Sequence, residues 1–305
     1  MPLSPIVLFT YNRLQNTRET VSCLLANPEA ADSDFIVYSD APKNERAADS
    51  VMQVREYLRT ITGFRSVTVV EREKNYGLVR NITTGVTETV NRYGRVIVLE
   101  DDHSVSPFFL RYMNEGLDRL AERDDIISIH GYMYPHKQPL PEAFLVKGAD
   151  CWGWATWKRA WALFDSDASR LYRELVAQQR ENEFDFNGSY PYTRMLKEQA
   201  EGTAGSWAVC WYASAFLLNK YTVYPNESLV SINSLCDEGV HNSSSRGMRK
   251  FRVHVKNEPI DWEKASLLEE SQEARAAFER FFRSLNSLRK RMLRFFLSLR
   301  KILIR

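Results

Sequence analysis

Apolar blocks and amphipathic segments alternate through the first hundred residues. Four continuous apolar blocks predict strands, at residues 5–12, 34–40, 66–72 and 96–99. Three segments between them carry apolar residues at helical spacing and predict helices, at residues 17–25, 50–60 and 80–93. Buried strands that alternate with helices are typical of a parallel sheet with both faces covered. The pattern therefore predicts an α/β fold with a mostly parallel sheet.

Polar side chains gather where three of these strands end, in the segments Thr10–Arg13, Ser39–Asp40 and Glu100–Asp102. The ligand crevice of a parallel sheet lies outside the carboxyl ends of its strands. The three adjacent carboxylates of Glu100–Asp102 repel one another, so they need either bulk water or a cation beside them. Two interpretations stay open, a solvated acidic turn and a site for Mg²⁺ or Mn²⁺, which take oxygen ligands.

The pattern changes after Ser106, where the chain becomes irregular and rich in aromatic residues. Four tryptophans lie within DCWGWATWKRAW (residues 150–161), and SWAVCWY (residues 206–212) adds two more. No repeat, low-complexity linker or Gly/Ser-rich boundary separates this part from the first. We therefore expect the two halves to pack as one catalytic unit, with a helical appendage from about Glu263 onward.

The charge is distributed unevenly. The formal net charge is +2, yet residues 278–305 contain nine Lys or Arg and one acid, so the rest of the chain is net negative. An acidic body argues against a nucleic-acid-binding core. The four cysteines form no CxxC pair, and the start of the chain lacks the basic leader and long apolar run of a signal peptide. We expect a cytoplasmic protein.

The segments PIVLFTYNR, VYSD, KNYGLVRN and VIVLEDD, in that order, resemble the nucleotide-binding half of GT-A-fold glycosyltransferases. The chain is similar to bacterial family 2 enzymes and to the N-acetylglucosaminyltransferase I type, whose metal motif is also Glu-Asp-Asp. The resemblance covers about residues 5–245. It implies a GT-A domain at residues 1–262, with a nucleotide-binding half (1–105) and an acceptor half (106–262), followed by the tail (263–305).

Roles for the strand-end residues follow from this resemblance. Asp102 would coordinate Mn²⁺ or Mg²⁺, while Glu100 and Asp101 would contact the donor's sugar or ribose. Asp40 would hydrogen-bond the nucleotide base.

Four further positions match the family pattern. Thr10 and Arg13 would line the nucleoside pocket, and Arg80 would reach the donor sugar or the diphosphate. His241 would lie over the diphosphate and ligate the metal. The alternatives are a surface salt bridge for Arg80 and a single backbone hydrogen bond for His241.

An inverting transfer needs a general base for the acceptor hydroxyl. The N-acetylglucosaminyltransferase I type carries its base in a Trp-Asp-Asp-Trp segment, but the comparable stretch here, Trp207 to Trp211, contains no acid. This departure leaves Asp150, Asp237 and Glu238 as candidates. Asp237 and Asp150 are favoured, and either aspartate could instead cap a loop.

Aromatic rings stack on the apolar faces of sugars, so the tryptophan-rich segments are candidates for acceptor binding. The alternative is that most of these rings fill the core, because aromatic side chains bury large areas. A glycine among them would let backbone approach a ligand closely. The acceptor candidates are Trp152, Gly153, Trp154, Trp207 and Trp211.

Apolar residues recur every three or four positions from Phe278 to Ile302, with basic residues mostly off that stripe. The longest uncharged run in its last half cannot span a bilayer. The pattern fits an amphipathic helix that lies on an anionic membrane, or a helix that docks onto the body or a partner.

Together these features predict a metal-dependent, inverting glycosyltransferase at the inner face of the cell membrane. It would transfer sugar from a nucleotide diphosphate donor, with UDP favoured, to a cell-surface glycan or lipid-linked acceptor. A nucleotidyltransferase is an alternative, although no Gly-rich phosphate loop follows the first strand. A catalytically inactive sugar-nucleotide-binding scaffold is another, because the segment from Trp207 to Trp211 lacks an acid.

Overall fold

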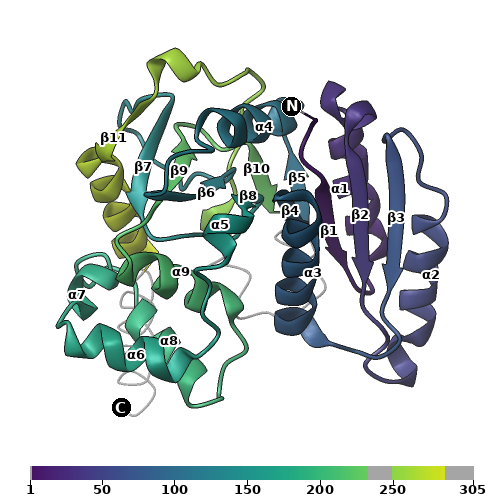
Figure 1. The fold of residues 1–305 in the computed structure, drawn as a ribbon, viewed down its shortest axis with the longest axis horizontal. Helices are drawn as coiled ribbons and strands as arrows, with labels where there is room; N and C mark the ends of the chain where they lie inside the picture. The colour runs from purple at the N-terminus through teal and green to yellow at the C-terminus, as the bar shows by residue number, and fades with distance from the viewer. Residues whose placement is uncertain (1, 233–248, 286–305) are drawn as a thin grey trace, which may run out of the picture.

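A nine-stranded sheet runs through the protein, which is described here by a computed structural model for residues 2–232 and 249–285 (Figure 1). From one edge to the other, the strands are β11 (Ser266–Glu270), β7 (Ala143–Lys147), β9 (Tyr221–Pro225), β6 (Ile126–His130), β8 (Trp154–Trp157), β4 (Arg95–Glu100), β1 (Ile6–Thr10), β2 (Asp34–Ser39) and β3 (Ser66–Glu71). A two-stranded ribbon pairs β5 (His103–Val105) with β10 (Val230–Ile232).

Helices surround this sheet. Those in the first half are α1 (Leu14–Leu25), α2 (Ala48–Leu58), α3 (Gly77–Tyr93) and α4 (Phe109–Arg119). Those in the second half are α5 (Lys158–Trp161), α6 (Ala168–Ala177), α7 (Glu181–Phe184), α8 (Tyr192–Ala200) and α9 (Trp207–Leu217). Short 3-10 helices lie at Pro28–Asp32, Glu45–Ala47, Arg249–Phe251 and Trp262–Lys264.

The first four strands are parallel, in the spatial order β4-β1-β2-β3. All five residues of β1 are buried, because α3 packs on β1 and β4 and further chain covers the other face. The predicted strands and helices of residues 5–100 are all present, and the α/β fold with a mostly parallel sheet is confirmed. Figure 1 shows this half, in purple and blue, on one side of the continuous sheet.

Strand β8 runs antiparallel to β4, with Val98 opposite Trp154. The segment before β8 therefore runs beside the residues that follow β4. Gly153 illustrates how tight this approach is: a Cβ built there would lie 2.7 Å from Val230 Cγ2 and 3.4 Å from Leu99 Cδ2, and its φ is +62°. Only glycine adopts this conformation readily. The pairing brings Asp150–Trp152 to the sheet edge that carries Glu100–Asp102.

The segment after Glu263 differs from the expected helical appendage. Residues 266–270 form β11, which pairs with β7 at the edge of the main sheet. Residues 272–285 are helical, and Phe278, Phe281 and Phe282 are buried in that helix. The first part of the apolar stripe therefore faces the body of the protein. The remaining predicted tail, residues 286–305, lies outside the described residues. No helix within residues 2–232 and 249–285 has the length and apolar character needed to cross a membrane.

Candidate active site

A pocket of about 350 Å³ opens at the carboxyl ends of β1, β2 and β4. The three polar clusters recognised in the sequence meet here, together with the start of α3. The lining includes Thr10–Arg13, Asp40, Lys43, Asn75, Gly77–Leu78, Asn81 and Glu100–Asp101. A pocket of this volume at this edge of a parallel sheet suits a nucleotide-sized ligand.

Asp40, at the end of β2, anchors the start of α3. Its Oδ1 accepts hydrogen bonds from the backbone N–H groups of Ala41 (2.9 Å) and Tyr76 (2.8 Å). Its Oδ2 accepts from the backbone N–H of Gly77 (2.9 Å) and from Asn75 Nδ2 (3.2 Å). A carboxylate offers about four lone-pair positions, and protein donors already use all of them. This geometry favours a role in shaping the pocket over direct contact with a base.

The acidic cluster contains its own cation. Arg13, just after β1, donates to the carboxylates of both Asp101 and Asp102, and its Nη1 lies 3.1 Å from Asp102 Oδ2. Burial lowers the pKa of Arg13, but the two carboxylates outweigh burial and raise it above its ordinary value. The repulsion that the sequence indicates is therefore relieved by a guanidinium group from the neighbouring strand.

Burial shifts the other groups of this cluster towards their neutral forms. It raises the pKa of Glu100 to about 8, with repulsion from Asp102 and Asp101 acting in the same direction. It raises the pKa of Asp101 to about 6, although Arg13 opposes the shift. Burial also lowers the pKa of His103 to about 4. The neutral His103 ring accepts a hydrogen bond from the Glu100 backbone N–H through Nδ1, at 3.2 Å.

A second cavity, of about 180 Å³, is lined in part by Asp150 and by the segment that precedes β8. Tyr134 Oη donates to Asp150 Oδ2 at 2.7 Å, and the Cys151 backbone N–H donates to Oδ1 at 2.9 Å. Burial raises the pKa of the adjacent Cys151 thiol, and Asp150, Glu100 and Asp102 lie close enough to act in the same direction. The structure therefore brings Asp150 and the acidic cluster together.

Residues 6–137, which build most of the first pocket, match the family described as Glycosyl transferase family 2. The match covers less than half of the chain, and it is to the part that carries the strand-end clusters. The match confirms the resemblance seen in the sequence and supports glycosyltransferase activity for the chain. No curated protein matches it.

Several solved structures are similar in part. One is the mannosyltransferase PcManGT from Pyrobaculum calidifontis in complex with GDP-Man and Mn²⁺, at 15% identity and a TM-score of 0.34, covering 45% of this chain and 36% of that one. Another is S. aureus TarS 1-349, at 12% identity and a TM-score of 0.44, covering 82% of this chain and 70% of that one. The chain thus spans about a third of the mannosyltransferase's length.

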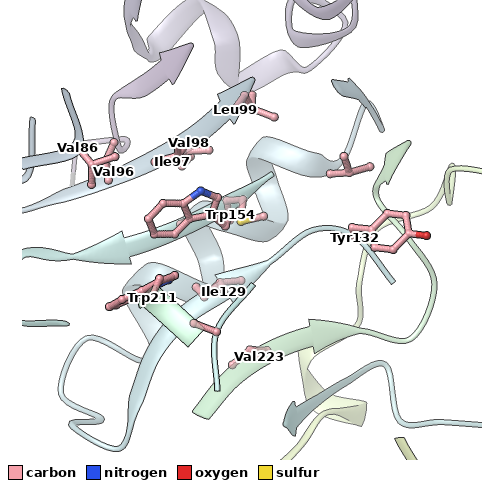
Figure 2. Packing of buried hydrophobic residues seen from close by; sticks show 14 of the residues in the cluster. Val86, Val96, Ile97, Val98, Leu99, Ile129, Tyr132, Trp154, Trp211 and Val223 are labelled. Atoms are coloured by element: carbon pink, nitrogen blue, oxygen red, sulfur yellow. The ribbon is translucent and has the colours of Figure 1, made fainter. Parts of the chain in front are cut away.

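Three of the expected acceptor residues belong to the hydrophobic core. Trp154, Trp207 and Trp211 are 1%, 4% and 0% exposed. Figure 2 shows Trp154 between Val98 and the strand carrying Ile129, with Trp211 beyond it. The prediction that these three residues stack on a sugar is therefore wrong, because their rings are buried in the core. Trp207 and Trp211 lie in α9, which is apolar on all sides, and a helix of this kind is buried.

The other two acceptor candidates differ from each other. Trp152 is half-buried and lines the second cavity. Gly153 lines neither cavity, and its lack of a side chain permits the close approach of β8 to Leu99.

Thr10 and Arg80 differ in their relation to the first pocket. Thr10 lines it, and the Thr10 hydroxyl is buried with no hydrogen-bond partner within the described residues. Arg80 is exposed on the first turn of α3, where its guanidinium stacks on the Tyr76 ring at 4.2 Å. It does not line the pocket in this structure. Asp237, Glu238 and His241 lie outside the described residues.

Asn75, Asn81 and Lys43 line the pocket but were not among the expected contacts. Two of them belong to the quoted motif KNYGLVRN, so the signal was present in the sequence. Within this motif, the family resemblance implied a role for Arg80 alone. Lys43 follows Asp40 by three residues and had no such signal.

The donor set of the acidic cluster fits a hard divalent cation. Within residues 2–232 and 249–285, no group of three or more His, Cys, Asp or Glu side chains is arranged to hold a metal. However, Asp102 is partly exposed, and Asp101 Oδ2 is buried without a hydrogen-bond partner in this part of the chain. Mg²⁺ and Mn²⁺ are often bound by one or two carboxylates, with phosphate and water completing the shell.

Proposed function

We propose that the chain transfers a sugar from a nucleotide diphosphate donor, with UDP favoured, to a hydroxyl group of a glycan or lipid-linked acceptor, with inversion. The main support is a pocket within the segment that matches family 2, at the ends of β1, β2 and β4, together with a second cavity in which Asp150 adjoins Cys151, a neighbour of the acidic cluster. The donor would occupy the first pocket, and the acceptor hydroxyl would approach from the second.

Asp150 is the general base in this proposal. The acceptor oxygen attacks the anomeric carbon, its proton passes to Asp150, and the bond between that carbon and the diphosphate oxygen breaks. Tyr134 and the Cys151 backbone N–H orient the carboxylate by donating to different oxygens. His130 lies 3.9 Å from Oδ1, and burial lowers the pKa of this histidine, so a neutral ring lies beside the base.

Asp102 and Asp101 would hold a divalent cation, Mn²⁺ or Mg²⁺, which would neutralise charge on the departing diphosphate. Arg13 bridges both carboxylates in this structure and keeps them oriented. The Thr10 hydroxyl, which has no hydrogen-bond partner among the described residues, would hydrogen-bond the nucleoside.

The membrane association predicted from the sequence is retained for the end of the chain. Residues 286–305 contain seven Lys or Arg and no acid. At about 1 kcal/mol for each basic residue near an anionic surface, such a segment suffices for peripheral binding. The protein would then act at the inner face of the cell membrane on glycans under assembly.

Calorimetry with UDP-, GDP- and dTDP-sugars in the presence of Mn²⁺ tests the donor site. We expect one donor class to bind, and we expect Asp102→Ala to abolish its Mn²⁺-dependent affinity while the fold stays intact. Equal affinity in the variant, with and without chelator, would refute the metal assignment. If a donor binds but no acceptor yields product, the inactive scaffold would be correct.

A further inference from the structure

The second cavity is walled by aromatic rings, and we infer that it binds an uncharged sugar ring of the acceptor, with the helix of residues 272–285 forming part of the wall. This inference rests on the proposed function and names the acceptor chemistry of the same site. We call the cavity the aromatic cavity; the residues used below to define it are Tyr134, Asp150, Trp152, Tyr190, Tyr192 and Phe282.

The rings of the aromatic cavity form a continuous surface. Tyr134 contacts Trp152 at 6.4 Å and Phe282 at 5.0 Å between ring centroids. Phe282 continues to Tyr190 at 4.8 Å, and Tyr190 to Tyr192 at 4.6 Å. Trp152, Tyr190 and Tyr192 are only half-buried, so parts of their surfaces remain open to a ligand. An apolar wall of this kind matches the C–H face of a pyranose ring.

One carboxylate supplies the polar end. Asp150 is the single acid, and no Lys or Arg is present, among the described residues that line the cavity. Asp150 accepts one hydrogen bond at each oxygen, so each oxygen can take another from a sugar hydroxyl. Burial raises the pKa of Tyr134 and Tyr192 well above the ordinary value, so both phenols stay protonated and neutral.

These charges select against anionic acceptors. A uronate or phosphate in the cavity would face the Asp150 carboxylate, and no basic side chain lines the described part of the wall. At separations of about 4 to 8 Å, like charges near a protein surface repel strongly enough to weaken binding by tenfold or more. A neutral ring with hydroxyl donors has no such cost.

Ala208 lines the cavity and belongs to the segment, Trp207 to Trp211, in which the sequence lacks the acids of the N-acetylglucosaminyltransferase I type. Its methyl group leaves Asp150 as the only acid among the described residues of the lining, and its small size leaves space for a ring. A larger side chain at this half-exposed position would fill the space without removing any contact.

The C-terminal helix completes the wall. Phe282 is 1% exposed and lines the cavity, and Phe278 packs on Tyr134 at 4.8 Å and Tyr224 at 5.2 Å. Lys250 contacts the last described turn of this helix: its Nζ donates to the Ser284 carbonyl oxygen at 2.7 Å. The segment that leads into the basic tail is therefore also part of the acceptor site.

The test uses saturation-transfer NMR on the full chain with methyl glycosides of a neutral hexose, an N-acetylhexosamine and a hexuronate. We expect saturation of at least one neutral glycoside, and signals at least tenfold weaker for the hexuronate. Ala208→Phe should abolish the neutral signal, whereas Ala48→Phe, at a half-buried position in α2, should not. Phe282→Ala should weaken the signal, and a thermal melt establishes that the variant is folded.

Equal signals for the uronate, a signal that survives Ala208→Phe, or the lack of any neutral signal would each overturn the inference. Binding of UDP-sugars, measured on the same samples, separates a failure of the inference about the aromatic cavity from a failure of the proposed function. Donor binding without glycoside binding refutes only the aromatic cavity. Failure of every nucleotide sugar to bind refutes the proposed function itself.

Discussion

Asp40, which follows β2, has two possible roles: contact with the nucleotide base, or a structural role at the start of α3. The substitution Asp40→Asn separates these two roles. The family resemblance implies contact with the nucleotide base, whereas the structure shows a carboxylate whose four acceptor positions are filled by the protein. Asparagine keeps the shape and one oxygen. Its NH₂ group would face two other donors, the Gly77 backbone N–H and Asn75 Nδ2. A structural role therefore predicts a loss of stability without any nucleotide present.

The magnitude follows from the two hydrogen bonds that asparagine cannot make. A hydrogen bond to a charged group contributes about 1.5 to 3 kcal/mol, and a buried donor left without a partner costs as much. We take the lower value for each and expect a loss of about 3 kcal/mol. At about 2 °C per kcal/mol for a chain of this size, Tm falls by about 6 °C.

Differential scanning fluorimetry of the nucleotide-free protein measures this shift. The matched control is Asp124→Asn, whose side chain is 89% exposed, and it should change Tm by less than about 1 °C. The structural reasoning is refuted if Asp40→Asn melts with the wild type while UDP-sugar affinity falls. That result would show that Asp40 is free to bind the base.

Three further predictions concern other parts of the protein. Asp150→Asn should lower turnover by about two orders of magnitude or more with nucleotide affinity unchanged, as measured by steady-state kinetics and calorimetry; full activity would exclude it as the base. Truncation after Leu285 should release the protein from anionic vesicles in sedimentation assays while preserving its Tm; equal binding would make the tail a packing segment. Burial would raise the pKa of Glu183, but Arg180 and Lys147 lower it to about 2. The ionised Glu183 therefore stabilises the folded protein fully above about pH 4.5, and this contribution is lost as the pH falls towards 2. Glu183→Gln should therefore lower the free energy of unfolding by about 1 kcal/mol at pH 7, a value discounted for solvent screening because the side chain is 36% exposed, and should have no effect near pH 2. Thermal melts at several pH values measure this difference, and a difference that does not depend on pH would contradict the prediction.

The first half of the fold could be predicted because its signals are local. Each strand of residues 5–100 is a continuous apolar run, and each helix carries its own apolar stripe. Parallel pairing then places the strand ends together without further information. The pocket at Thr10–Arg13, Asp40 and Glu100–Asp101 follows from these facts alone.

The second half depends on contacts that no local pattern contains. Tryptophans that fill a core and tryptophans that stack on sugars have the same composition, and only burial separates Trp154 and Trp211 from Trp152. The tail presented a similar ambiguity. Its apolar stripe predicts an amphipathic helix, but the sequence does not say whether a membrane or the aromatic residues of the body cover Phe278 and Phe282.

Arg13 shows how the two kinds of information combine. The sequence indicates that Asp101 and Asp102 need either bulk water or a cation. The sheet order places the end of β1 beside the end of β4, so the Arg13 guanidinium can supply the positive charge from within the chain. An acidic cluster paired in this way is ordered before any donor arrives. A divalent cation entering with a nucleotide diphosphate would then share these carboxylates with Arg13, whose freed N–H groups are suited to bind phosphate oxygens. The Arg13 guanidinium, which stabilises the pair of carboxylates, would then also bind the diphosphate of the donor.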